Sequence, residues 1–132
     1  MQDTKISFNF FKIVFKETLK NKSLPRILLN YNLMNIELSG QILDLGSKSD
    51  KASYNRFLKC APNSKITYTD WHEEGENIVK LNLEENFSIS AGVYDAITCF
   101  NVLEHIYNSD NTIKESYRIL KSNGLFIGQT PF

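Results

Sequence analysis

Tyr94-Asp-Ala-Ile-Thr-Cys-Phe-Asn-Val-Leu-Glu-His-Ile106 is the stretch that decides the fold class, together with its continuation Arg118-Ile-Leu-Lys-Ser-Asn-Gly-Leu-Phe126. Residues 96–100 form a nearly continuous apolar and β-prone run, which is typical of a strand covered on both faces. Residues 125–130 resume a strand after a helix with cap candidates at 108–110. A crossover of this length predicts two parallel neighbouring strands with right-handed connectivity.

The helix between these strands is predicted from Ile113, Tyr117 and Leu120, which recur at helical spacing as its apolar face. Arg118 and Lys121 fall in its last turn, where the helix dipole favours cations. The dipeptide Asn123-Gly124 is expected to end the helix through a left-handed residue.

Three further strands are predicted upstream. Gln41-Ile-Leu-Asp-Leu-Gly46 ends in an acid and a glycine, and Lys65-Ile-Thr-Tyr-Thr-Asp70 also ends in an acid. In a Rossmann-type domain, an acid at the end of the second strand holds a ribose diol. Residues 77–81 form a shorter third strand, and a helix capped by Ser49 or Asp50 is expected after the glycine turn. This alternation predicts an α/β fold with a doubly wound parallel sheet.

The combination of these motifs resembles the class I S-adenosylmethionine-dependent methyltransferases. In that family a strand like Tyr94-Asp-Ala-Ile97 opens into a turn like Asn101-Val-Leu-Glu-His105. The resemblance covers residues 40–132 and implies a Rossmann-like sheet of the methyltransferase type that lacks the last two strands, preceded by an N-terminal helical segment at residues 1–39. It also implies S-adenosylmethionine as the cofactor.

The resemblance implies a set of cofactor-binding residues, each of which follows the carboxyl end of a predicted strand. They are Asp44, Gly46, Ser47 and Lys48; Asp70 and Trp71; Asn82 and Leu83; and Phe100, Asn101 and Val102. The first and last groups would line the methionine half of the cofactor. The second group would hold the ribose and pack on the adenine, and the third would meet the adenine amino group.

Two features depart from the family pattern. The family's turn reads acid-x-Gly-x-Gly-x-Gly, but Lys48 and Asp50 stand in place of the second and third glycines. Their side chains could obstruct the cofactor, or Lys48 could pair with the cofactor carboxylate while Asp50 caps a helix. The second departure is that the sequence stops just after the fifth strand, so we expect a truncated domain or one that completes its sheet with another chain. The strand edge at residues 125–127 is expected to self-associate or to be covered by the N-terminal helices.

His105 is a candidate catalytic base, because a histidine near its unperturbed pKa can remove a proton from a hydroxyl acceptor. The alternative, which we favour, is that Glu104 and His105 only fix the turn by hydrogen bonds. No metal site is expected, because two separated histidines and scattered acids give no ligand spacing.

The composition fits one domain with one core, since the chain has 132 residues and 42% hydrophobic content. The formal net charge is zero, so no overall basic field favours nucleic acid, although a local patch is still compatible with binding. Cys60 and Cys99 lack metal or redox spacing and are expected to be reduced core thiols. Lysines interrupt every apolar run near the start, so we expect neither a secretory segment nor a membrane span, and a cytoplasmic location.

The first forty residues predict two helices. Phe8, Phe11, Phe15 and Leu19 recur at helical spacing with lysines on the other side, and a second helix starts near Pro25. We favour packing of the first helix on the sheet over a lid or a membrane-surface helix. Phe10 and Val14 widen its apolar face and leave a protein contact open.

Three function classes remain open. The first is an S-adenosylmethionine-dependent methyltransferase, or its cofactor-binding portion, that acts on a small molecule or a glycan or lipid precursor. The second is a methyltransferase-like binding or assembly module without turnover. The third is a nicotinamide oxidoreductase, which the acid ending the second strand fits equally well. The sequence lacks, however, the G-x-G-x-x-G turn that holds a pyrophosphate in that class.

Overall fold

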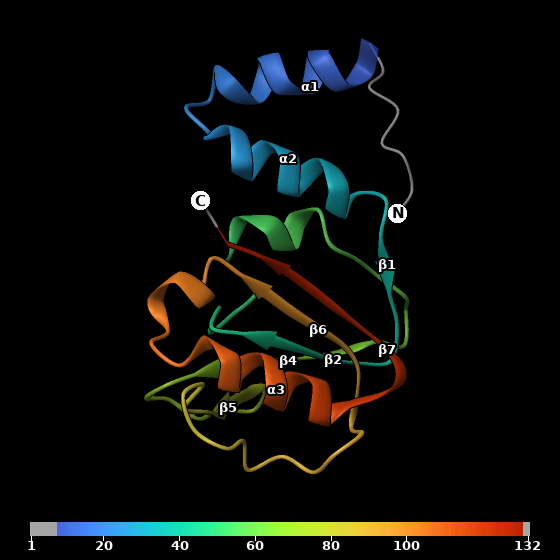
Figure 1. Cartoon of the computed structure of the whole chain (residues 1–132). Helices are drawn as coiled ribbons and strands as arrows, with labels where there is room; N and C mark the ends of the chain where they lie inside the picture. Colours follow the sequence, from blue (N-terminus) through green and yellow to red (C-terminus); the bar gives the residue numbers. More distant parts are fainter. Residues whose placement is uncertain (1–7, 131–132) are drawn as a thin grey trace.

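The fold is built on a five-stranded parallel sheet with helices on both sides, seen in a computed structural model that describes residues 8–130 (Figure 1). Its five strands lie in the order β5-β4-β2-β6-β7. Their bounds are β2 Gln41–Leu45, β4 Lys65–Asp70, β5 Ile78–Lys80, β6 Tyr94–Phe100 and β7 Leu120–Gln129. All four neighbouring pairs are parallel, which confirms the predicted doubly wound α/β architecture.

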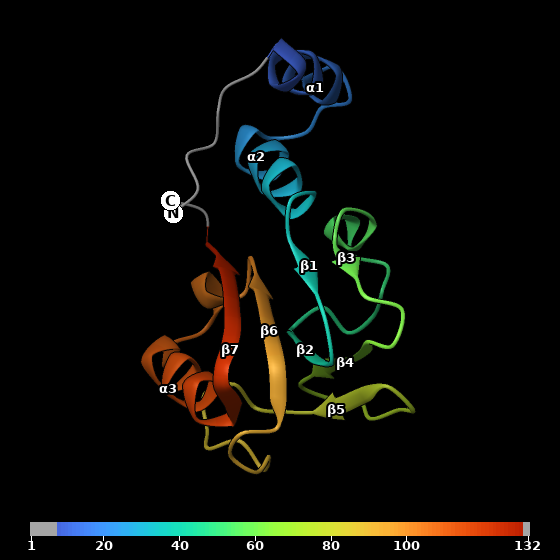
Figure 2. The ribbon, with the colours of Figure 1, turned by 90° about the vertical axis from the view of Figure 1, so that its right-hand side faces the viewer.

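The remaining elements surround this sheet. They are α1 Phe8–Thr18, α2 Leu24–Leu33, α3 Ser109–Ile119, two 3-10 turns at Ser53–Arg56 and Leu103–His105, and a small parallel pair of β1 Glu37–Leu38 with β3 Lys59–Cys60. Figure 2 shows α3 on one side of β6 and β7, with β1 and β3 on the other side. In both views α1 lies beyond α2, on the far side from the sheet.

The core is centred on β2 and β6, the two middle strands. Ile42, Leu43, Leu45, Ile97 and Cys99 have no exposed surface, as expected for strands covered on both faces. Both cysteines in the chain are free, as predicted, but Cys60 is only half-buried.

The apolar face predicted for α3 is not the face that the helix buries. Tyr117 is 83% exposed and Ile113 is 44% exposed, whereas the buried residues of the helix are Thr112, Glu115, Ser116 and Ile119. Three of these four are polar because the helix faces a loop without secondary structure of its own. The loop needs hydrogen-bond partners for its backbone, and the helix provides them.

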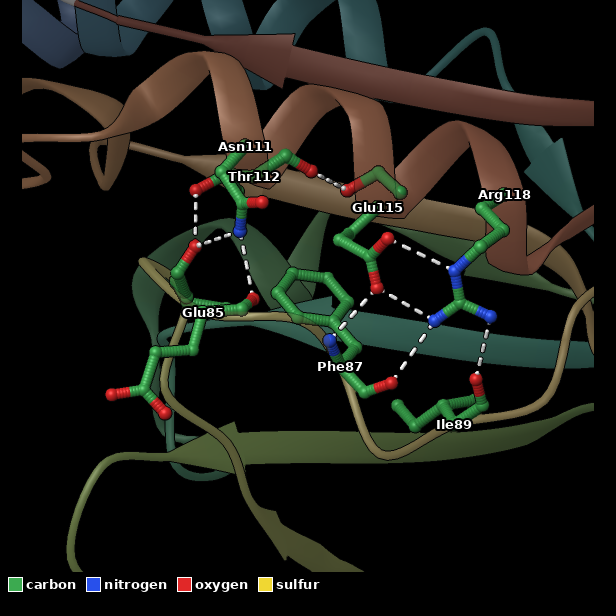
Figure 3. A network of polar contacts seen from close by, with 9 residues as sticks. Glu85, Phe87, Ile89, Asn111, Thr112, Glu115 and Arg118 are labelled. Atoms are coloured by element: carbon green, nitrogen blue, oxygen red, sulfur yellow. Dashed lines mark hydrogen bonds and ion pairs between the residues drawn. The ribbon is translucent and has the colours of Figure 1, made fainter.

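Figure 3 shows this network between α3 and residues 83–89. Glu115 accepts a hydrogen bond from the Phe87 backbone N–H at 2.8 Å, and Arg118 donates to the backbone oxygens of Phe87 and Ile89 at 3.0 and 2.9 Å. Arg118 also pairs with the Glu115 carboxylate and holds its pKa below the ordinary value. Thr112 completes the set by donating to the Leu83 oxygen at 2.8 Å. The loop is therefore fixed to α3 along most of its length.

The helix also ends earlier than predicted. The last residue of α3 is Ile119, and Leu120 already pairs with Tyr94 in the sheet. Asn123 does have the left-handed backbone that was predicted, at φ 66°, but it lies within β7, in the bulge where the register with β6 shifts. Pairing then resumes from Leu125 opposite Ala96, which confirms the predicted inner partner of this strand. Its other side is the edge of the described sheet.

Two helix predictions near the start of the chain are corrected as well. No regular helix follows the glycine turn; residues 53–56 form only a single 3-10 turn, in which Tyr54 is buried. Packing of α1 on the sheet is also wrong, because α1 packs on α2 through Phe10, whose ring meets that of Tyr31 edge-on at 5.0 Å. No helix within residues 8–130 is long and apolar enough to cross a membrane.

Candidate functional site

A cavity of about 250 Å³ opens where four strands of the sheet end. Its walls are residues at or just beyond the carboxyl ends of β2, β4, β5 and β6: Gly46, Thr69, Asp70, Trp71, Leu81, Leu83, Asn101, Val102, His105 and Ile106. In open parallel sheets, ligands bind at the carboxyl ends of the strands, and this cavity lies there. Seven of the lining residues were predicted from the sequence as site residues.

The turn at Gly46 requires glycine for two reasons. Its φ is +82°, and a Cβ at this position would lie 2.8 Å from Val102 Cγ2. Its backbone N–H donates to Thr69 Oγ1 at 2.8 Å, and the same hydroxyl donates to the Asp44 carbonyl oxygen at 3.2 Å. Thr69, which is almost completely buried, therefore fixes the turn to the end of β4.

Asp44 lies below this turn rather than on the cavity wall. Its carboxylate accepts hydrogen bonds from Tyr54 Oη at 3.2 Å and from Thr98 Oγ1 at 3.0 Å. Burial raises the pKa of Asp44 to about 6, although these donors and Ser47 oppose the rise. Tyr54 comes from the segment that was predicted to be helical, so the sequence did not indicate this partner.

Asp70 and Trp71 form the side of the cavity at the end of β4. One oxygen of Asp70, Oδ1, accepts the backbone N–H groups of His72 and Glu73 at 2.8 and 2.9 Å. These bonds hold the pKa of Asp70 below its ordinary value, so the group is a carboxylate at neutral pH. Among residues 8–130, no hydrogen bond to the other oxygen, Oδ2, is found. Trp71 is 49% exposed beside it.

Lys48 adopts the backbone conformation that a glycine would favour, with φ +62°. Its ammonium group pairs with the Glu73 carboxylate at 2.5 Å, which raises the pKa of the lysine. Lys48 is not among the residues that line the cavity. The turn therefore keeps a left-handed residue here despite the missing glycine.

Of four other predicted site residues, only one lies on the cavity wall. Leu83 lines the cavity, but Asn82 uses its side-chain oxygen to accept the Glu84 N–H at 3.0 Å. Phe100 is buried against Tyr54, with ring centroids 4.7 Å apart, and is not on the cavity wall. The Ser47 hydroxyl is buried near Asp44, whose pKa it lowers, but it makes no hydrogen bond of ordinary geometry within the described part of the chain.

The predicted base, His105, lines the cavity at the end of the 3-10 turn that follows β6. Its backbone N–H donates to the Val102 oxygen at 2.9 Å. The neighbouring Glu104 accepts a bond from the Thr130 hydroxyl at 3.3 Å, which links this turn to the end of β7. No group of three or more potential metal ligands occurs within residues 8–130.

The sequence did not indicate three of the lining residues: Thr69, Leu81 and Ile106. No local signal marks Thr69, because alternation along the strand puts its side chain on the face opposite to Asp70, and its role depends on the Gly46 turn of another strand. Two larger hollows, of about 480 and 280 Å³, share the turn at residues 121–124. They lie at the amino ends of β6 and β7, away from the strand exits that bear the predicted site, so we assign the site to the smaller cavity.

These features define a Rossmann-like α/β domain with a crevice at its topological switch point. A family model described as a methyltransferase domain matches residues 17–132. The chain therefore belongs to this methyltransferase domain family. A search of curated protein sequences gives no significant match.

Solved structures agree on the fold. A proposed methyltransferase from Bacillus halodurans superposes with a TM-score of 0.55 at 19% identity, over 73% of this chain and 48% of its own. A proposed S-adenosyl-L-methionine-dependent methyltransferase from Methanococcus maripaludis gives 0.55 at 17% identity, over 97% and 67%. A proposed methyltransferase in complex with the Trm112 methyltransferase activator of Haloferax volcanii gives 0.57 at 13%, over 85% and 54%. The chain thus spans about half to two thirds of these proteins.

Proposed function

We propose that the cavity at the strand ends binds S-adenosylmethionine and that the chain is the cofactor-binding portion of a methyltransferase. The observation that carries this proposal is the convergence of Gly46, Asp70, Trp71 and Asn101 on one cavity, from three different strands. The family to which the chain belongs implies the same cofactor.

The residues fit the parts of this cofactor. Asp70 offers a carboxylate for the ribose diol, where charge-assisted hydrogen bonds are strong, and the exposed Trp71 ring offers a surface for the adenine. Gly46 lets the backbone approach a ligand closely, because no Cβ intervenes. When bound, the cofactor supplies an electrophilic methyl group, and the protein's task is to place an acceptor in line with it.

We propose a small molecule, or a glycan or lipid precursor, as the acceptor. His105 is the candidate base for a hydroxyl acceptor, since it lines the same cavity as Gly46 and Asp70. A second function, binding without turnover, is favoured by the side chains at Lys48 and Asp50, where the family pattern has glycines. Lys48 meets the Glu73 carboxylate rather than the cavity, which supports an intact turn and hence the first function.

Calorimetry of the purified chain with S-adenosylmethionine, S-adenosylhomocysteine and NAD tests the proposal. We expect binding of both S-adenosyl compounds and none of NAD. Asp70→Ala should weaken binding by about 1.5–3 kcal/mol, the range for hydrogen bonds to charged groups. Asp110→Ala, which removes an exposed carboxylate on α3 outside the cavity, is the matched control and should bind normally.

Absence of binding to the unmutated chain would refute the proposal. Equal affinity of folded Asp70→Ala would remove that residue from the site. Binding of S-adenosylmethionine without methyl transfer to any acceptor offered would favour the second function.

We also propose that a second copy of the chain can pair along β7, because this strand is the outer edge of the described sheet. Light scattering should then show a dimer. Within Leu125 to Ile127, hydrogen exchange should be slow at the outward amide of Phe126 as well, because the amides of Leu125 and Ile127 already face β6. A monomer in which the Phe126 amide exchanges rapidly would contradict this.

A further inference from the structure

The outer face of α1 carries an apolar stripe that nothing in the described structure covers. The stripe consists of four side chains spaced about one turn apart, Phe8, Phe11, Phe15 and Leu19. They are 77%, 61%, 70% and 70% exposed, in that order. The opposite face of α1 contacts α2, through Phe10 against Tyr31. Figure 2 shows α1 as the element furthest from the sheet. Because Phe10 makes the contact with α2 and the stripe is exposed, the stripe lies on the side of α1 away from α2.

Exposed lysines flank this stripe. Lys12, Lys16 and Lys20 follow one another at one-turn intervals, and the Lys12 ammonium lies over the Phe8 ring at 4.8 Å. Glu17 is the sole acid between Phe8 and Lys22, and it faces inward, where Lys20 and Lys22 both pair with it. The exposed surface of α1 is therefore apolar along its centre and positive at its margin, without an exposed acid.

We propose that α1 is an interfacial helix that binds the surface of an anionic lipid bilayer, with its phenylalanines among the acyl chains. Amphipathic helices that lie in the interface combine bulky apolar residues on one face with lysines that reach the headgroups. Anionic lipids supply the charge complementary to the lysines. The contact with α2 holds the helix in its folded form before binding, so little ordering is needed.

Two other occupants fit less well. A second copy of α1 would bring two lysine margins together, and like charges across an interface are unfavourable. A protein groove would be expected to meet anchors such as Trp, Tyr or Arg, which dominate protein interfaces, but the stripe holds only Phe and Leu. A bilayer has no such requirement, because it recognises apolar area and charge.

The test is co-sedimentation of the full chain with vesicles. One set contains phosphatidylcholine alone, and the other contains equal parts of phosphatidylcholine and phosphatidylglycerol. We expect binding to the anionic vesicles that falls as salt is added, and weaker binding to the neutral ones. The result is independent of cofactor binding.

Three double variants, each checked by circular dichroism for retained fold, make the test specific. Phe11→Ser with Phe15→Ser should weaken binding about a hundredfold or more, since each buried phenylalanine is worth about tenfold. Lys12→Glu with Lys16→Glu should weaken binding to anionic vesicles only. Ile113→Ser with Tyr117→Ser removes comparably exposed apolar groups from α3 and should have no effect.

Failure of the unmutated chain to sediment with anionic vesicles would overturn the proposal. So would an equal loss in the α3 variant, because binding would then reflect general stickiness. Self-association by light scattering that disappears in the phenylalanine variant, without vesicle binding, would assign the stripe to a second copy instead.

Discussion

Replacing Asp44 by Asn should make the protein more stable at neutral pH, although it removes a side chain at the centre of a hydrogen-bond network. Asp44 is 1% exposed, and its pKa is about 6 in the folded chain against an ordinary value of 3.8. The difference corresponds to about 3 kcal/mol, at about 1.4 kcal/mol for each tenfold change in the proton equilibrium. The ionised Asp44 carboxylate therefore destabilises the folded chain, because water solvates it better in the unfolded chain.

The sign follows from proton binding. Between about pH 4 and pH 6 the folded chain binds more protons at Asp44 than the unfolded chain does, so the free energy of unfolding falls as pH rises. Below this window the penalty is absent, and above it the penalty is complete. An amide cannot ionise, so Asp44→Asn should remove this dependence and gain up to about 3 kcal/mol at pH 7, less any hydrogen bond that the amide fails to reproduce for Tyr54 or Thr98.

Urea unfolding from about pH 4 to about pH 7 measures the effect, with the midpoint and slope followed separately. Asp95→Asn is the matched control with the opposite sign. The Gln41 N–H and Lys121 lower the pKa of Asp95, so its contribution to stability is present at neutral pH and is lost as pH falls. If unmutated protein and Asp44→Asn show the same pH profile, the buried carboxylate carries no such penalty and the reasoning fails.

Three smaller changes test other parts of the site. Gly46→Ala should cost at least about 1–2 kcal/mol of unfolding free energy, from the left-handed backbone alone, and should abolish cofactor binding; normal affinity would show that the turn can widen. Lys48→Gly should change the free energy of unfolding by less than about 1 kcal/mol, because the strain of a left-handed lysine backbone is removed while an exposed ion pair is lost. Calorimetry should find unchanged cofactor affinity; weaker binding would show that the lysine contacts the cofactor carboxylate. Arg118→Leu should cost about 2 kcal/mol in urea unfolding, because it leaves two loop carbonyls and Glu115 Oε1 without a donor, and only Oε2 keeps the Phe87 N–H; the exposed Lys114→Leu on the same helix should be near neutral.

Sequence patterns predicted the sheet well because buried strands leave strong local signals. The apolar run at Tyr94–Phe100 and the acid-ended run at Lys65–Asp70 became β6 and β4 with little change in bounds. The resemblance also placed most residues of the cavity wall, since strand exits of a parallel sheet converge at one edge. Phe100 is different: it was predicted for the cofactor, but its side chain packs on Tyr54, which lies in a single 3-10 turn where a regular helix was predicted.

The helix faces were predicted poorly, for reasons that a single sequence does not contain. Periodicity shows that α1 and α3 have apolar stripes, but not what lies beside them. In α1 the stripe at Phe11 and Phe15 faces outward, because Phe10 makes the contact with α2. In α3 the polar side was buried because a neighbouring loop lacked backbone partners, which is a tertiary demand.

Because α3 buries a polar face, its polar positions should tolerate substitution less well than its apolar ones, the reverse of an ordinary amphipathic helix. Thr112 and Ser116 would be taken as surface positions by hydropathy, yet they have almost no exposed area. The Thr112 hydroxyl donates to the loop at Leu83, a cavity residue. Natural variation in proteins that share this arrangement should therefore be restricted to small hydroxyl residues at these two positions. At Ile113 and Tyr117, charged residues should be accepted freely wherever no partner covers them.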